Sequence, residues 1–322
     1  MNLHLVLVSA ALTGALTISQ GVLAQRQPPA HPSGPPPTAQ QAAPIDLTGY
    51  WVSVVTEDWR WRMLTPPRGD YASIPLNAAG RKIADQFNPA LYGGATATGA
   101  VGGGGSLPGQ VQRVPLGRYQ VSGTIDCRAY GAAGIMRMPT RVHISWDGPN
   151  ELELRTDWGE QTRRFHFLPG QPGADTPQVA TAQVQAAGIE RGPASMQGYS
   201  VAVWERPYGL NEPAYLRGSM PRPRGLPGEE PQAPPPGGDL AVVTTNLAPA
   251  WLRRNGVPYG AHARLTEHYF VFHDPTGATL FDVTTEVIDP EVLYTPCITS
   301  SDFEQEPDES KWAPHPCNRV AE

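Results

Sequence analysis

The feature that most constrains the fold of this chain is an alternation of apolar and polar residues with a period of two. It is clear in 141–146, where apolar Val142 and Ile144 alternate with polar neighbours. Because successive side chains of a β-strand point to opposite sides, this pattern predicts a strand with one buried face. A turn at 147–150 and a second alternating run at 151–156 predict a β-hairpin.

Similar runs recur along the chain and predict about eight strands in total. Further runs lie at 52–55, 161–167, 198–205, 239–245, 263–272 and 279–288. One helix is predicted at 75–87, and no strand–helix–strand rhythm is present. The chain also has 34 Gly and 36 Pro, which favour long loops. Together these features predict a mostly β fold: a single antiparallel β-barrel or a barrel-like sandwich, lipocalin-like, with few helices and long Gly/Pro-rich loops.

The first residues are typical of a secretory signal peptide. The run 5–18 carries no charged residue, and small or apolar residues at 22–24 precede an expected cut before Gln25. We therefore predict a signal peptide at 1–24 and a periplasmic or secreted protein, the alternative being an uncleaved N-terminal anchor. No later run is long and apolar enough to span a bilayer, so no transmembrane segment is expected after the signal is removed.

The rest of the chain divides by composition into a tether and one domain. Residues 25–44 are rich in Pro, Ala and Gln and are expected to form a disordered tether. Residues 45–318 are expected to form one β-rich domain, because no internal repeat suggests two. Its loop insertions are expected near 92–118, 169–196 and 206–238.

The charge balance excludes one class of partner. The chain has 24 Lys and Arg against 30 Asp and Glu, a formal net charge of −6, and only 17% of its residues are charged. Nucleic acid demands a concentrated basic face, so it is not an expected partner. The expected partner is a small-molecule ligand, and composition leaves the oligomeric state open.

Three cysteines occur, Cys127, Cys297 and Cys317. In an oxidising compartment two of them are expected to pair and one to remain free. Cys297–Cys317 would close a short loop, whereas Cys127–Cys317 would tie the tail across the domain. The spacing matches no zinc motif, so neither a metal nor another cofactor is expected.

The segment 57–62 is the densest block of candidate site residues. Trp59 and Trp61 offer stacking area, Arg60 can bind an anionic or hydroxylated ligand, and Glu57 can act as a base. The alternative is a structural strand, in which two tryptophans separated by one residue share an inward face.

Histidines on predicted strands supply a candidate acid–base site. Three histidines fall on predicted strands: His143, His166 and His268. If their polar faces pointed into a barrel, they would converge with Arg141, Arg164, Glu153 or Asp157. Imidazole titrates near neutral pH, which suits proton transfer. A divalent metal site is the less favoured use, and structural surface histidines are the ordinary alternative. The predicted catalytic set is His166, His143, Asp157 and Glu57. The predicted ligand-binding set is Trp59, Trp61, Arg60, Arg141, Arg164, Tyr199 and Trp146.

Two patterns of residues resemble known proteins. Gly49-Tyr50-Trp51 resembles the Gly-x-Trp start of lipocalin-like barrels, in which the Trp plugs one end. A longer series of landmarks resembles a large, poorly characterised family of signal-peptide-bearing β-proteins from soil and environmental bacteria. The resemblance covers roughly 46–317 without the insertions, implies export and a β-fold, and transfers no catalytic residue. Its landmarks are Asp46–Trp51, Ile135–Pro139, Val142–Ile144, Gly198–Val201, Val242–Thr245, Leu265–His268 and Asp289–Glu291.

The same resemblance bears on the cysteines. The position of Cys297 is aromatic in the closer relatives of that family. This implies a disulfide between Cys127 and Cys317 and a free Cys297.

Three functions follow from these observations. The first is an exported β-barrel that binds a small hydrophobic or aromatic ligand in an internal pocket, with aromatic side chains as its walls. The second is a cofactor-free periplasmic lyase, isomerase or hydrolase that uses a His–carboxylate pair with Arg anchoring the substrate. The third is an envelope protein-interaction module that presents its Pro-rich loops. Whether the protein is an enzyme is left open by the sequence.

Overall fold

The computed structural model describes residues 37–88, 126–168, 191–205 and 239–317. The predicted signal peptide and most of the predicted insertions lie outside these residues. All the described residues belong to one compact unit. None of the helices among them is long and apolar enough to cross a membrane.

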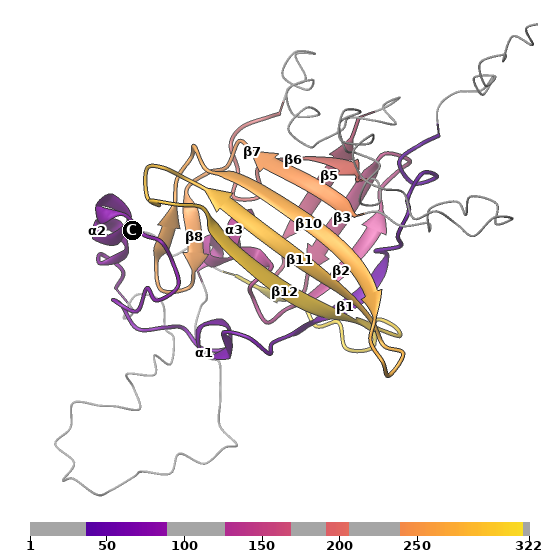
Figure 1. The fold of residues 1–322 in the computed structure, drawn as a ribbon, viewed down its shortest axis with the longest axis horizontal. Helices are drawn as coiled ribbons and strands as arrows, with labels where there is room; N and C mark the ends of the chain where they lie inside the picture. The colour runs from indigo at the N-terminus through magenta and orange to yellow at the C-terminus, as the bar shows by residue number, and fades with distance from the viewer. Residues whose placement is uncertain (1–36, 89–125, 169–190, 206–238, 318–322) are drawn as a thin grey trace, which may run out of the picture. The chain divides into compact units, whose positions relative to one another are not determined.

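Within the described residues, nine strands close into a barrel (Figure 1). Around the barrel the order is β1, β12, β11, β10, β7, β6, β5, β3 and β2, and β2 pairs back to β1. The prediction of a mostly β fold with few helices is confirmed, and of its two forms the barrel is the one that occurs. In chain order the strands are β1 (Gly49–Val54), β2 (Arg141–Trp146), β3 (Glu151–Thr156), β5 (Thr162–Phe167), β6 (Tyr199–Trp204), β7 (Leu240–Thr245), β10 (Arg264–His273), β11 (Thr279–Ile288) and β12 (Cys297–Glu306).

The barrel is mixed, because one neighbouring pair is parallel. β5 and β6 run in the same direction, with Phe165 opposite Ser200, whereas the other pairs around the barrel are antiparallel. Parallel neighbours need a crossover connection, which a hairpin turn cannot provide. The alternation of residues fixes which face of a strand is buried, and it does not fix the direction in which the strand runs.

β12 closes the barrel between β1 and β11, although it is not among the predicted strands. Its inward positions include Ser301, which is buried opposite Val283, and Phe303, which is buried opposite Phe281. A small hydroxyl residue at an inward position breaks the apolar alternation that marks the other strands. The sequence therefore lacks the usual signal for this strand.

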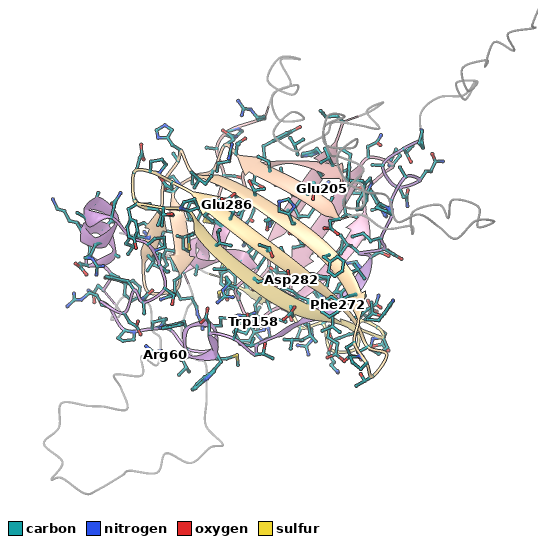
Figure 2. All side chains as sticks on the ribbon, in the orientation of Figure 1. Arg60, Trp158, Glu205, Phe272, Asp282 and Glu286 are labelled. Atoms are coloured by element: carbon teal, nitrogen blue, oxygen red, sulfur yellow. A yellow bond between two sulfur atoms is a disulfide. The ribbon has the colours of Figure 1, made fainter. Side chains whose placement is uncertain are left out.

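Large aromatic side chains occupy the barrel interior. Trp51 is fully buried; its ring centroid lies 4.9 Å from that of Phe281, and its Nε1 donates to the Leu47 carbonyl at 2.9 Å. Phe281 in turn stacks on Phe303 at 4.8 Å. Burial of each such side chain stabilises the fold by roughly 1.5–3 kcal/mol. On the opposite face of β11, Asp282 and Glu286 point outward (Figure 2).

The interior also contains a fully buried ion pair. Arg163 of β5 donates to both carboxylate oxygens of Glu267 of β10, at 2.6 and 2.9 Å, and neither side chain is exposed. Thr244 accepts from Arg163 at 3.3 Å, and the Tyr269 hydroxyl donates to Glu267 at 3.2 Å. Burial lowers the pKa of Arg163 and Glu267 raises it, and the net direction is upward. The pair is thus charged and closely matched.

Short elements gather at the end of the barrel where β11 ends and β12 begins, here called the cleft end (Figure 1). The predicted helix at 75–87 is confirmed over α2, and the Asn77 side chain caps it by accepting from the Gly80 amide at 2.9 Å. The disulfide between Cys127 and Cys317 is present and Cys297 is free, as the resemblance implied. Two further strands of two residues each, β4 (Trp158–Gly159) and β13 (His315–Pro316), pair with each other in parallel. The short elements are α1 (Trp59–Arg62), α2 (Ala78–Ala84), η3 (Cys127–Tyr130), α3 (Ala132–Ile135), β8 (Ala250–Arg253) and β9 (Val257–Tyr259).

The N-terminal segment contacts the other end of the barrel. The Ala39 amide donates to Asn150 Oδ1 at 2.8 Å, and the Ala39 carbonyl accepts from Trp204 Nε1 at 2.8 Å. The Gln40 amide donates to the Pro149 carbonyl at 3.1 Å. These residues belong to the last part of the predicted tether, and here they pack against the barrel.

Candidate functional site

A cleft of about 230 Å³ lies at the cleft end of the barrel. Its walls come from α1 and the residue pair before it, from α3 and the loop that follows, from β8, and from the start of β12. Six charged side chains line it: Glu57, Asp58, Arg62, Arg137, Arg253 and Arg254. Its apolar lining is Trp61, Ile74, Ala133, Met138, Leu252, Val287 and Ile298.

The predicted aromatic and charged block supplies one wall of this cleft. It forms the single-turn helix α1, so the strand considered as its structural alternative was wrong. Side chains two positions apart on a helix point to different sides. Trp59 is consequently 60% exposed, whereas Trp61 lines the cleft.

Arg62, the last residue of α1, is buried and tied to three elements. Its Nη2 donates to Ser53 Oγ of β1 at 2.9 Å and its Nε donates to the Arg137 carbonyl at 3.2 Å. Its Nη1 forms an ion pair with Glu57. This arginine therefore fixes α1 against the barrel while contributing charge to the cleft.

Arg137 shares the Glu57 carboxylate with Arg62. It pairs with Glu57 at 3.2 Å and with Asp58 at 2.6 Å, and it donates to the Ser300 carbonyl of β12 at 2.6 Å. Arg62 and Arg137 thus use the two carboxylates of the cleft as their counter-ions.

Arg253, at the end of β8, is anchored on carbonyl oxygens. Its two terminal nitrogens donate to the carbonyls of Asp70 at 3.4 Å and Ala72 at 3.0 Å. Its guanidinium carbon lies 5.0 Å from the ring centroid of Trp61, and that of Arg60 lies 4.5 Å from the same ring. Two guanidinium groups therefore contact one indole, an arrangement with cation–π character.

Arg254, the residue after β8, is half-buried beside the buried Arg62. Its Nη2 donates to the Arg62 carbonyl. Burial lowers the pKa of Arg254, of Arg253 and of Arg62, because the charged form loses hydration. The protein therefore replaces only part of the hydration that these three guanidinium groups lose on burial.

Two backbone features shape the cleft. Gly134 of α3 lines it, and a Cβ at this position would lie 2.6 Å from the Trp251 carbonyl oxygen, so glycine allows α3 to approach β8. Asp58 and Ser73 adopt left-handed backbone conformations, with φ of 53° and 67°. They are two of the four non-glycine residues with positive φ in the described chain, and both line the cleft.

Cys297 also lines the cleft and is buried. Burial raises the pKa of its thiol, while nearby Arg253 and Arg137 act in the opposite direction. The thiol is therefore protonated at neutral pH and contributes apolar surface to the wall.

Among the predicted site residues, Glu57 and Trp61 lie in the cleft, and Arg60 lies beside it. Arg60 is exposed and forms an ion pair with Asp70 at 3.0 Å, at the α1 end of the view in Figure 2. Trp59 belongs to the same helix but points to solvent. The structure thus brings together one part of the predicted set.

The predicted histidines lie on the outer face of the barrel, on the side opposite the core residues of their strands. His143 stacks on Tyr50 at 4.3 Å. Burial and then Arg155 lower the pKa of His143. His166 stacks on Tyr199 at 4.6 Å, and its Nδ1 lies 2.9 Å from a Glu151 carboxylate oxygen. The polar faces point away from the interior because the apolar faces fill it.

Asp157 is fully buried, and its carboxylate accepts hydrogen bonds from neighbouring residues. Its Oδ1 accepts from the Thr140 hydroxyl at 2.7 Å and from the amides of Arg141 and Trp158 at 2.9 and 2.6 Å. These contacts hold the turn after β3, and neither His143 nor His166 bonds to Asp157. The histidine beside it is His315, whose backbone amide donates to the Asp157 carbonyl at 2.8 Å.

The remaining predicted ligand-binding residues lie apart from the cleft lining. Arg141 pairs with Glu306 at 2.8 Å. Arg164 pairs with Glu153 at 2.8 Å and also with Asp147 and Glu151 on the outer face. Trp146 packs at the other end of the barrel, 6.3 Å from Trp204 between ring centroids.

Arg137, Arg253 and Arg254 were not among the predicted site residues, and Arg62 lay in the predicted block 57–62 without a role of its own. The sequence carries two weak signals for them. Arg253 and Arg254 are adjacent, and Arg137 stands between two buried methionines in the landmark run 135–139. A charged residue within an apolar run often marks a site, but only the fold brings these segments together.

The described residues contain no cluster of three or more His, Cys, Asp or Glu side chains able to hold a metal ion. Comparisons with protein-family models, with curated proteins and with solved structures give no match. The class of protein that the structure defines is a mostly β protein with a closed nine-stranded mixed barrel and an arginine-lined cleft at one end of it.

Proposed function

We infer that this protein is an exported β-barrel that binds a small organic ligand with an apolar or aromatic group, in the cleft at the end of the barrel. The observation that carries this inference is the mixed lining of the cleft, in which apolar side chains and guanidinium groups face one space of about 230 Å³. Apolar walls with a few placed polar groups are the usual composition of small-molecule sites.

Backbone strain supports the same location. Left-handed conformations at Asp58 and Ser73 each cost on the order of 1 kcal/mol, and they persist only where the surroundings enforce them. Such residues concentrate at ligand sites. Two of them on the walls of one cleft favour a functional role for that cleft.

Binding is preferred to acid–base catalysis because the predicted partners do not meet. His143 and His166 lie on the outer face, Asp157 is enclosed by its own turn, and Glu57 is neutralised by two arginines. The interaction-module hypothesis depends on 206–238, which lie outside the described residues.

Export is supported by two features. The disulfide between Cys127 and Cys317 would persist in an oxidising compartment, and the first 24 residues have the pattern of a signal peptide. We propose the periplasm or the medium as the place where the ligand is met.

Native mass spectrometry of the full exported protein, purified without denaturation, tests this function. Ile298 lines the cleft and is 64% exposed, so Ile298→Trp should obstruct the cleft without disturbing the core. Phe270→Trp is the matched control, because Phe270 is a 50% exposed apolar residue outside the cleft lining. We expect a co-purified small molecule in the wild type and in Phe270→Trp, and its loss in Ile298→Trp. Equal retention in both variants, or no bound molecule in any of the three proteins, would overturn the proposed function.

A further inference from the structure

The charges that line the cleft do not balance. Four arginines face two carboxylates. The ion pairs of the cleft use both carboxylates for Arg62 and Arg137. Arg253 and Arg254 form no ion pair with any residue that the structure describes, so two cations remain without a counter-ion.

Neighbouring acids do not remove this surplus. Asp70 is close to Arg253, but its carboxylate already pairs with Arg60 at 3.0 Å. Asp302 lies near Arg62 on the outer face of β12, and burial followed by Asp282 raises the pKa of this carboxyl. A group whose pKa is raised is a weaker source of negative charge than an ordinary aspartate.

The guanidinium group of Arg253 is held in place before any ligand arrives. Two carbonyl oxygens accept from it, and the Trp61 ring lies beside it. An arginine fixed in this way loses little conformational freedom when it binds a partner. Because it is partly desolvated, its interaction with an anion is stronger than at an open surface.

We propose that the cleft recognises the carboxylate of a small organic acid, with Arg253 as its principal anchor and Arg254 as the second cation. This inference rests on the proposed function and names the chemical class of its ligand. The apolar or aromatic body of the acid would lie against Trp61, Ile74 and Ile298, which line the same cleft. A carboxylate matches the planar fork of a guanidinium, whereas a bare inorganic anion would leave these apolar walls uncovered.

Isothermal titration calorimetry of the full exported protein with matched acids and amides tests the proposal. The probes are benzoate, phenylacetate and 4-methylpentanoate, each paired with its neutral amide, together with inorganic sulfate. Each acid should bind at least about 10-fold more tightly than its amide, because a hydrogen bond to a charged group contributes more than a neutral one. Added salt should weaken binding of the acids and leave that of the amides unchanged.

Substitution of Arg253 then tests the anchor. Arg253→Gln should weaken binding of the acids by about 10-fold or more and leave binding of the amides unchanged, whereas Arg253→Lys should restore part of the lost affinity. Arg155→Gln is the matched control, since it removes the same charge from an exposed position on β3, three strands from β12 around the barrel. Thermal unfolding of each variant shows whether it is folded.

The outcomes separate this inference from the proposed function. Acids and amides that bind equally well in wild-type protein would overturn carboxylate recognition and leave small-molecule binding intact; this comparison needs no variant. Equal weakening by Arg253→Gln and Arg155→Gln would remove Arg253 as the anchor. If sulfate binds tightly and none of the organic acids binds, the cleft recognises an inorganic anion, and the proposal is overturned. Failure of all the probes to bind would count against the proposed function as well.

Discussion

Arg163 is fully buried in the barrel interior, whereas Arg253 and Arg254 are half-buried at the cleft, and the two regions differ in how these charges are compensated. In the interior, Arg163 meets Glu267 in a two-bond ion pair with both side chains fully buried. In the cleft, Arg253 and Arg254 have carbonyl partners and no carboxylate among the described residues. A matched pair needs nothing further, whereas unmatched cations beside an open space can accept an anion from outside. The contrast separates a structural ion pair from the cations of the proposed binding site.

The largest expected effect comes from breaking the interior pair. Arg163 and Arg164 are neighbours on β5 whose side chains point to opposite faces, one fully buried and the other 46% exposed. Arg163→Met leaves Glu267 as an unpaired buried charge and should lower the free energy of unfolding by about 3–5 kcal/mol. Arg164→Met removes only exposed ion pairs and should cost less than about 1 kcal/mol. Urea denaturation of both variants measures the difference.

A double variant sharpens this test. Arg163→Met combined with Glu267→Leu replaces both charges by apolar groups and should recover most of the lost stability. If the double variant is no more stable than Arg163→Met alone, the loss comes from packing around Arg163, and the interior charge is not the feature that matters.

The disulfide is expected to have the next largest effect, and it acts at the cleft end. Cys127 lies in η3, next to α3, and its bond to Cys317 spans 190 residues of sequence. Replacing both cysteines by Ala should lower the free energy of unfolding by about 2–5 kcal/mol, since the unfolded chain is no longer constrained. Thermal unfolding with and without reductant measures this loss. Cys297→Ala is the control, and its melting temperature should keep its full sensitivity to reductant; a wild type insensitive to reductant would contradict the expectation.

The same two regions show what the sequence could predict. The interior follows from a local pattern: alternation predicts that Val142 and Ile144 share a buried face, and both are buried in the barrel. Neither β12 nor the parallel pairing of β5 and β6 follows from that pattern. Small hydroxyl residues at inward positions interrupt the apolar alternation of β12, and alternation does not depend on the direction in which β5 and β6 run.

The cleft could be predicted only in part, because its residues come from segments far apart in the sequence. Glu57 and Trp61 belong to a dense block that attracts attention by itself. Arg137 stands singly between two methionines and Arg253 is followed by Arg254, and only the fold brings these segments to the same space. The histidines mislead for a related reason: alternation predicts that they share a polar face, and the large apolar side chains then decide that this face is the outer one.

The unmatched cations of the cleft should contribute little to stability, in contrast with Arg163. Arg253→Gln loses hydrogen bonds to the carbonyls of Asp70 and Ala72 but also relieves the cost of a desolvated charge. We therefore expect the free energy of unfolding to change by less than about 1 kcal/mol in the absence of ligand. Chemical denaturation in low salt measures it. A loss as large as that of Arg163→Met would make Arg253 a structural residue and remove the contrast between the two regions.

The smallest expected effect concerns a charge pair at the surface, where solvent screens it. His268 on the outer face of β10 is 43% exposed, and its Nδ1 lies 3.0 Å from a Glu205 carboxylate oxygen, with Asp239 and Glu286 nearby. The hydrogen bond to Glu205 raises the pKa of His268, and partial burial opposes this. Because the folded pKa lies above the unfolded value of about 6.5, the stabilisation is complete below that pH and is lost as pH rises through the folded pKa.

We accordingly expect His268→Gln to remove a pH dependence that the wild type shows just above about pH 6.5. The difference should be roughly 0.2–1 kcal/mol, as for other exposed pairs, and should shrink in high salt. Urea denaturation of both proteins across that interval measures it. Were the two proteins to show parallel curves, the Glu205 contact would make no net contribution. Were the difference instead to approach that of the interior pair, burial would not be what distinguishes strong from weak charge pairs in this barrel.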